Sequence, residues 1–178
     1  MNVKVVFSFF ILLGIFSIPS LNVSQSHTKK IEKEIKKEWQ IENFSMQAIA
    51  VSSAVNQQLP IKISNNNLFK IVKDNQVFGY AFVNSAPSKT ATFDYLVLLD
   101  KNRVINHTKV LVYREEYGGE IGSKRWLKQF LGKTENDRLE YKNNIDAISG
   151  ATISVRSMTN AMDNFLKTVK ILHQNNIL

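Results

Sequence analysis

The sequence predicts a single α+β domain in which an antiparallel sheet of hairpins packs against a C-terminal amphipathic helix. Two patterns predict this fold. Between Leu68 and Tyr113, apolar residues follow a period of two that is broken by short polar turns, as in paired antiparallel strands. From about Ile153 to His173, apolar residues recur at helical spacing and mark one buried face. The chain of 178 residues has room for one such domain after an N-terminal segment.

Residues 1–26 are predicted to be a signal peptide or an N-terminal membrane anchor. A short basic start ending at Lys4 precedes an apolar run from Val5 to Ile18, and Pro19 follows. This run is short for a membrane span and typical of an export signal, whereas its extension to Val23 approaches the length of an uncleaved anchor. Both alternatives stay open, and both predict that the remaining chain is exported, to the periplasm or the extracytoplasmic face of the membrane.

Residues 27–45 are predicted to form an amphipathic helical lead-in, because Ile31, Ile35 and Trp39 recur every four residues among Lys and Glu from Thr28 to Glu42. The predicted strands follow in the order Met46–Val51, Leu68–Lys73, Gln76–Asn84, Thr92–Asp100 and Arg103–Tyr113. Polar turns separate them at Ser64–Asn67, Lys73–Asn75 and Ser85–Lys89.

A glycine-bearing loop, Glu115–Gly122, follows the last strand. A short helix is then expected around Trp126 and Phe130, ended by Gly132, and a polar connection runs from Thr134 to Asn144. The apolar stripe of the last helix consists of Val155, Met158, Met162, Phe165, Val169 and Leu172.

Composition narrows the functional classes. The net charge is +8, but the basic residues are scattered or interleaved with Glu, which favours a solvated helix face over a nucleic-acid site. The absence of cysteine excludes disulfides, thiolate metal sites and iron–sulfur ligation. His27, His107 and His173 lack ligand-like spacing, so we interpret them as surface residues and predict no metal site.

A small-residue turn immediately precedes the last helix. It reads Asp146-Ala147-Ile148-Ser149-Gly150-Ala151-Thr152, with Ser154 two positions further on. Ser149, Thr152 and Ser154 are good helix-capping residues, and Gly150 permits backbone geometry that is closed to other residues. Because a helix N-terminus leaves N–H groups unpaired and carries a partial positive charge, the turn suits an anion.

The same turn resembles the attachment motif of the FMN-binding domain family, in which an acidic residue, two spacers, Ser or Thr, Gly, Ala and then Thr or Ser precede a helix. Asp146, Ser149, Gly150, Ala151 and Thr152 fit that motif. The resemblance implies that Thr152 is joined to FMN through a phosphoester by a separate flavin transferase, which takes the FMN unit from FAD with magnesium. Asp146 is then either a recognition residue for the transferase or only a turn carboxylate.

The resemblance extends upstream and implies an FMN-binding domain over residues 46–178. Trp126, Phe130, Gly132 and Lys133 follow the order found in the family, with Trp126 interpreted as a core residue in preference to a flavin-stacking partner. The loop departs from the usual family form, and its implied flavin-binding residues are Glu116, Gly118 and Gly119. A plain surface turn is the alternative for this loop.

Two functions remain in view. The first is an electron-transfer flavoprotein that carries covalent FMN, resembles the FMN subunits of the Rnf and sodium-pumping NADH:quinone oxidoreductase complexes, and works with a membrane redox partner rather than as a stand-alone enzyme. The second is a non-redox exported binding module, in which the basic body docks on acidic polymers or a membrane surface and the turn merely caps a helix.

Overall fold

The computed structural model describes the backbone of residues 23–178 and the side chains from Thr28 onward. Its strands are β1 (Ser45–Ala48), β2 (Leu68–Lys73), β3 (Gln76–Pro87), β4 (Thr92–Asp100) and β5 (Ile105–Tyr113). Its helices are α1 (Val23–Trp39), α2 (Ser53–Gln58), α3 (Lys124–Leu127) and α4 (Thr152–Gln174), with short 3-10 turns at Gly119–Gly122 and Lys128–Phe130.

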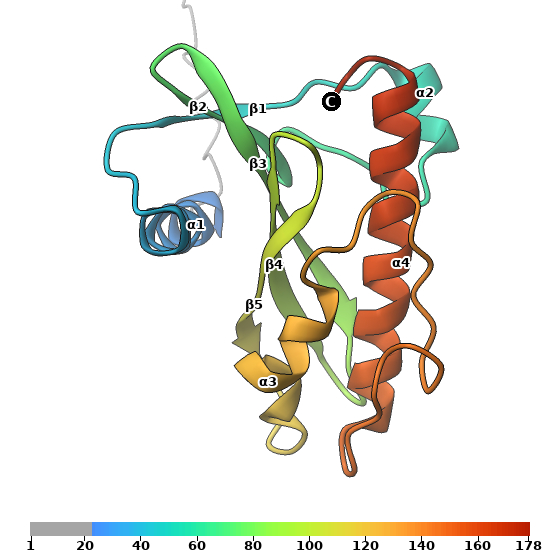
Figure 1. Ribbon diagram of the computed structural model, residues 1–178. Coiled ribbons are helices and arrows are strands. Elements are labelled where there is room, and N and C mark those ends of the chain that lie inside the picture. The colour runs from blue at the N-terminus through green and yellow to red at the C-terminus, as the bar shows by residue number, and fades with distance from the viewer. Residues whose placement is uncertain (1–22) are drawn as a thin grey trace, which may run out of the picture.

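The five strands form one antiparallel sheet in which spatial order follows chain order, and helices cover both faces (Figure 1). Helix α4 lies along one face, and α1 crosses the other. Strand β4 is buried from Phe93 to Leu99 because it lies between the two layers. The predicted α+β fold is confirmed.

The predicted signal or anchor falls on residues 1–22, which lie outside the described residues. Within residues 23–178, no helix has both the length and the apolar character that a membrane crossing requires.

The main core lies between the sheet and α4. Alternate residues of the central strands, such as Phe82, Tyr95 and Val97, face the helix, as the period of two requires. The rings of Phe82 and Phe165 stack with their centroids 4.3 Å apart. All six residues of the predicted α4 stripe are buried, so the helical periodicity identified the correct face.

A second core lies beneath α1. Ile31 and Ile35 are buried against Leu96 and Leu98, whose side chains point away from α4. At the end of α1, Trp39 lies against Gly79, where a Cβ would stand 2.3 Å from the backbone oxygen of Leu99 and 2.7 Å from the tryptophan ring. Only glycine fits at this close approach.

Element boundaries differ modestly from those predicted. The lead-in helix ends at Trp39 rather than near Glu42, because Gln40 adopts a left-handed conformation with φ of 53°. The first strand is Ser45–Ala48 rather than Met46–Val51. Strand β3 continues to Pro87, so the turn into β4 spans residues 88–91.

The turn between β2 and β3 is as predicted. Asp74 and Asn75 both have positive φ, 51° and 61°, which is the conformation of a two-residue hairpin turn and which Asp and Asn tolerate best among residues with a Cβ.

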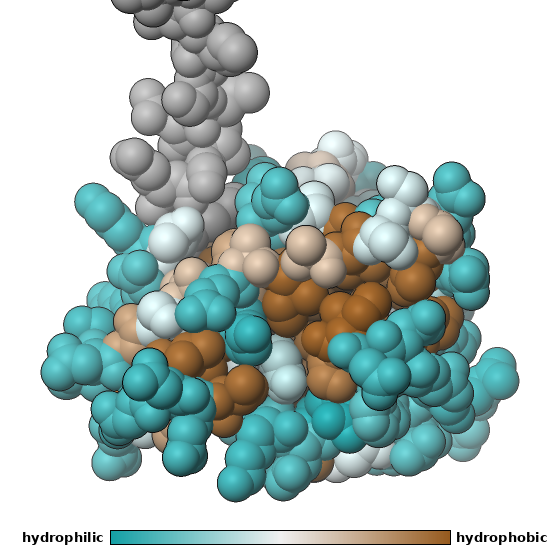
Figure 2. All heavy atoms as spheres, turned by 90° about the horizontal axis from the view of Figure 1, so that it is seen from above, coloured by the Kyte–Doolittle hydropathy of each residue, from teal (hydrophilic) through white to brown (hydrophobic). Residues whose placement is uncertain are grey.

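Helix α2 was not predicted. It has no buried residue and therefore no apolar stripe, and its main sequence signal is Ser52, whose hydroxyl accepts from the N–H of Val55. The helix lies at the end of the molecule where the C-terminus also lies (Figure 1). Viewed from that end, apolar side chains gather in the middle of the surface within a polar rim (Figure 2).

Candidate functional site

Helix α4 begins at Thr152 without a side-chain cap. Ala151 occupies the N-cap position and has no side chain that could accept a hydrogen bond. The expectation that Ser149, Thr152 or Ser154 caps the helix is therefore wrong. Thr152 and Ser154 are already inside the first turn, and Ser149 precedes the N-cap residue by two positions.

The missing cap leaves backbone donors available. Within the described chain, no acceptor takes the N–H groups of Thr152, Ile153 or Ser154, whereas the N–H of Val155 bonds to Ala151. Unpaired N–H groups at the start of a long helix, together with the helix dipole, stabilise a negative charge placed beside them. The start of α4 therefore suits a phosphate.

The turn before α4 is presented to solvent. Asp146, Ser149, Gly150 and Thr152 are all exposed. Gly150 has φ of +80°, a left-handed conformation that glycine adopts without strain. Thr152 and the residues before it are thus accessible from solvent.

Strand β5 and the following loop hold the first turn of α4 in place. The Tyr113 hydroxyl donates to the backbone oxygen of Tyr117 at 2.9 Å and lies 3.1 Å from the hydroxyl of Ser154. Gly118, with φ of +83°, packs so closely that a Cβ would stand 2.8 Å from the Tyr113 oxygen and 3.2 Å from the Ala151 Cβ. Ser154 is 4% exposed, and the contact of its hydroxyl with Tyr113 holds the first turn of α4 against β5.

A shallow depression of about 330 Å³ opens beside Thr152. Its lining residues come from three parts of the chain: Lys89, Tyr113, Glu115, Tyr117, Gly150, Ala151, Thr152, Ile153 and Ser154. Two large apolar or aromatic side chains are exposed here, Tyr117 at 82% and Ile153 at 49%. Exposed groups of this kind offer contact area to a flat aromatic ligand.

Glu115 organises the turn that brings Lys89 to this depression. Its carboxylate accepts hydrogen bonds from the Ser88 hydroxyl at 2.6 Å, from the backbone and hydroxyl of Thr90 at 2.6 and 2.8 Å, and from the N–H of Ala91 at 3.0 Å. These bonds, the Ser88 bond foremost, lower the pKa of Glu115 from 4.5 to about 2. The carboxylate is therefore charged at neutral pH and fully engaged.

The other end of the turn is anchored on the buried Trp126. Its indole N–H donates to the backbone oxygen of Asp146 at 2.9 Å, and the Gln129 side chain accepts from the Asp146 N–H at 2.8 Å. Trp126 is 5% exposed, in agreement with its interpretation as a core residue. Hydrogen bonds thus hold both backbone groups of Asp146, and the residue is exposed to solvent.

The structure gathers some of the predicted site residues and not others. Gly150, Ala151, Thr152 and Ser154 line the depression, and Gly118 packs against Ala151. The remaining four, namely Asp146, Ser149, Glu116 and Gly119, lie outside its lining.

Glu116 is exposed, and the acidic residue that enters the depression is its neighbour Glu115. Lys89, Tyr113, Tyr117 and Ile153 were also missed by sequence reasoning. The pairing of Phe93 with Tyr113 places the β3–β4 turn beside the end of β5. The local sequence around Lys89 carries no signal of this pairing.

Comparison with known proteins bears on this geometry. Residues 90–167 match the model of the FMN-binding domain. Over these residues, the chain is similar to the FMN-binding domain family. The matched stretch runs from the β3–β4 turn into α4 and includes every residue that lines the depression except Lys89, so the resemblance inferred from Asp146–Thr152 is confirmed.

The crystal structure of NqrC from Shewanella oneidensis has a similar fold, with a TM-score of 0.50 and 18% sequence identity. The similarity covers 74% of this chain and 70% of that one. At this identity the likeness concerns the fold. No curated protein matches the chain.

Proposed function

We propose that this protein is an extracytoplasmic electron-transfer flavoprotein whose FMN is attached through a phosphoester to Thr152. One observation carries the proposal: within the stretch that matches the FMN-binding domain, the exposed Thr152 stands at the uncapped start of α4. It lies beside three N–H groups that have no acceptor among the described residues. A phosphate bonded to this side chain lies where the helix favours an anion.

The chain does not supply the groups that activate Thr152. No described His or Lys hydrogen-bonds its hydroxyl, and a threonine hydroxyl is a weak nucleophile without a neighbouring base. A separate flavin transferase that uses FAD and magnesium fits this absence. The Thr152 oxygen forms a bond to the FMN phosphorus of FAD, the phosphoanhydride bond breaks, AMP leaves, and the hydroxyl proton is released.

Several residues would hold the attached cofactor. The first-turn N–H groups would bond phosphate oxygens, and Lys89 would contribute a positive charge at the depression. Tyr117 and Ile153 offer exposed surface to the isoalloxazine ring. Gly118 keeps the loop close to Ala151, which fixes Tyr117 relative to Thr152.

Electron transfer is the role that this site supports. Bound FMN supplies reversible redox chemistry, and covalent attachment prevents its loss to the outside medium. The depression is open to solvent, so a ring bound there would lie within reach of a partner. The likeness to the FMN subunits of the Rnf and sodium-pumping complexes favours a membrane redox complex as that partner.

Mass spectrometry tests the attachment. The protein is produced together with a flavin transferase and digested, and the peptide that contains Thr152 is expected to gain the mass of FMN minus water. Thr152→Ala should abolish the gain, whereas Thr152→Ser should retain it because the hydroxyl remains. Intact mass of the same material reports whether residues 1–26 are removed.

An unmodified Thr152 peptide would overturn the proposal, provided that a known acceptor is flavinylated in the same cells. A colourless protein that binds polyanions in a salt-sensitive manner would instead favour the basic binding module. Cell fractionation tests the location, since export predicts recovery outside the cytoplasm.

A further inference from the structure

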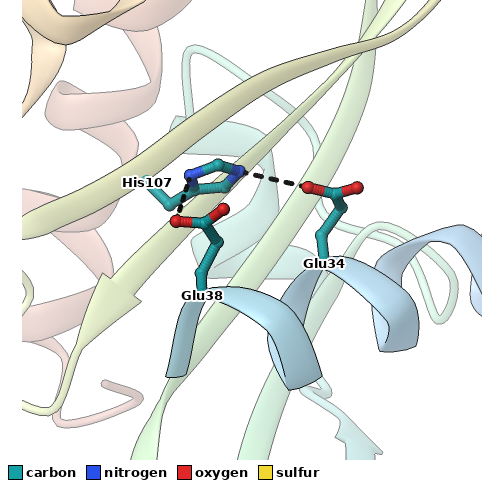
Figure 3. A group of neighbouring side chains, drawn as sticks. All are labelled: Glu34, Glu38 and His107. Atoms are coloured by element: carbon teal, nitrogen blue, oxygen red, sulfur yellow. Dashed lines mark ion pairs between the residues drawn. The ribbon is translucent and has the colours of Figure 1, made fainter. Parts of the chain in front are cut away.

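A cluster of three titratable side chains lies on the face of the sheet opposite α4. Glu34 and Glu38 stand one turn apart on α1, and His107 projects from β5 toward them. Figure 3 shows the imidazole ring between the two carboxylates, with one ring nitrogen directed to each. The cluster takes no part in the site at Thr152, which lies against the other layer.

The ligand atoms are close together. His107 Nε2 is 3.6 Å from Glu34 Oε2, and His107 Nδ1 is 3.4 Å from Glu38 Oε2. One such atom from each residue can be chosen so that all three lie within 4.8 Å of one another. The two short distances involve different ring nitrogens, and one ion bonds only one of them. A change of glutamate rotamer is therefore needed to bring both carboxylates to the same nitrogen, with metal–ligand bonds of roughly 2.0–2.2 Å.

The buried part of the cluster is unsatisfied. Glu34 is 5% exposed, yet its Oε2 makes no hydrogen bond in the described chain, and neither does the buried Nε2 of His107. The second oxygen of Glu34 is held by the ammonium group of Lys109. The two atoms form only a long ion pair of 3.6 Å with each other. Buried polar atoms without hydrogen bonds are costly, and an ion bonded to both atoms would satisfy them.

From this geometry we propose a binding site for a divalent transition-metal ion, with Glu34, Glu38 and His107 as its ligands. Two carboxylate oxygens and one imidazole nitrogen suit Zn²⁺ and related ions better than Mg²⁺ or Ca²⁺, which prefer oxygen ligands alone. The Glu38 side chain is 30% exposed, so the ion enters from that side and water completes its coordination.

The surrounding charges are compatible with a cation. Lys109 bonds only Oε1 of Glu34, and Lys37 lies 3.6 Å from Oε1 of Glu38, so both Oε2 atoms remain directed at His107. Burial lowers the pKa of His107, against the raising influence of the two carboxylates. The neutral ring is the form that binds metals.

An ion at this point would join two elements that are distant in sequence. Helix α1 otherwise rests on the sheet mainly through the small second core around Ile31 and Ile35. Ligands from both α1 and β5 would fasten the helix to the sheet, because a metal that binds only the folded arrangement stabilises it.

Isothermal titration calorimetry with Zn²⁺ tests the site on the full chain after treatment with EDTA, without any flavin transferase. We expect saturable binding of about one ion and a rise in melting temperature. His107→Gln and Glu34→Gln should each weaken binding about tenfold or more, since even indirect changes around a metal have effects of that size. Mg²⁺ should bind far more weakly.

His173→Gln is the matched control, because His173 pairs with Glu135 rather than with this cluster. If Glu34→Gln does not fold, Glu38→Gln replaces it, since Glu38 is more exposed. Absence of saturable Zn²⁺ binding to the parent chain would overturn the proposal. Undiminished binding in folded His107→Gln would also overturn it, since the ion would then be held elsewhere.

Discussion

Gly118 is the residue at which the loop after β5 touches the start of α4. Substitution by Ala forces a side chain into a left-handed conformation, which costs about 1–3 kcal/mol, and drives its Cβ against Tyr113 and Ala151. We expect Gly118→Ala to lower both the free energy of unfolding and the yield of FMN attachment. Urea denaturation and flavin absorbance measure the two effects.

Gly132→Ala is the control that separates the cost of backbone strain from the cost of a packing clash. Gly132 also has positive φ, +77°, but a Cβ there meets nothing within 4 Å. Gly132→Ala should therefore cost the strain alone and leave attachment intact. Equal losses in the two variants would contradict the role assigned to the contact between Gly118 and Ala151.

Glu115 gives a second test at the level of a single residue. Its folded pKa of about 2 is below the ordinary 4.5, so its hydrogen bonds stabilise the fold fully above about pH 4.5 and less as the pH falls toward 2. Glu115→Gln should be less stable than the parent at neutral pH, and the difference should shrink on acidification. Denaturant unfolding at several pH values measures it; a constant difference would refute the assignment.

At the scale of single residues, Thr152 and the small residues around it could be predicted as a site because their order is local and matches a family motif. The structure places Gly150, Ala151, Thr152 and Ser154 together at one depression. Sequence reasoning chose Glu116 over Glu115, since adjacent acidic residues in a loop carry no periodicity that shows which one points inward. Lys89 and Tyr117 could not be predicted as site residues from the local sequence, because their positions depend on strand pairing.

Among the elements, α4 forms the larger core and also carries the site, so its packing is a natural target. Phe165→Ala removes the ring that stacks on Phe82 and should destabilise the protein by about 3–5 kcal/mol. Lys170→Ala, on the exposed side of the same helix, should change stability by less than about 0.5 kcal/mol. Similar effects of the two changes on thermal unfolding would argue against the buried stripe.

The elements that were predicted well are those whose burial produces a clear period. Helix α4 and strands β2 and β4 have the predicted extents to within a residue or two, because one or both faces are buried along their length. Helix α2 has no fully buried residue and so leaves no apolar stripe. The helix cap was misassigned because Ser and Thr favour N-cap positions on average, whereas here Ala151 occupies that position.

The whole molecule has its two cores on opposite sides of one sheet. A substitution in the core beneath α1 should therefore lower stability without changing the site at Thr152. Ile35→Ala opens the core beneath α1 and should cost about 2–5 kcal/mol. Flavin attachment at Thr152 should persist in protein that remains folded, because that site lies with the other layer. Lys33→Ala, on the exposed side of α1, is the control.

Calorimetric unfolding and flavin absorbance on the same preparations make this comparison. A folded Ile35→Ala protein that fails to accept FMN would show that α1 contributes to the site.

The contact between His107 and Glu34 also belongs to the scale of the whole molecule, since it joins segments far apart in the chain. Spacing along the sequence indicated a surface histidine, and only the packing of α1 on β5 brings it close to two carboxylates.

The two tryptophans of the chain divide between these layers. Trp39 lies at the end of α1 over Gly79, whereas Trp126 bonds to Asp146 beside the turn that leads to Thr152. The protein thus contains a separate intrinsic fluorophore on each side of the sheet. In a variant that keeps only Trp126, the fluorescence would report energy transfer to a flavin. In a variant that keeps only Trp39, the fluorescence would report whether α1 is packed on the sheet.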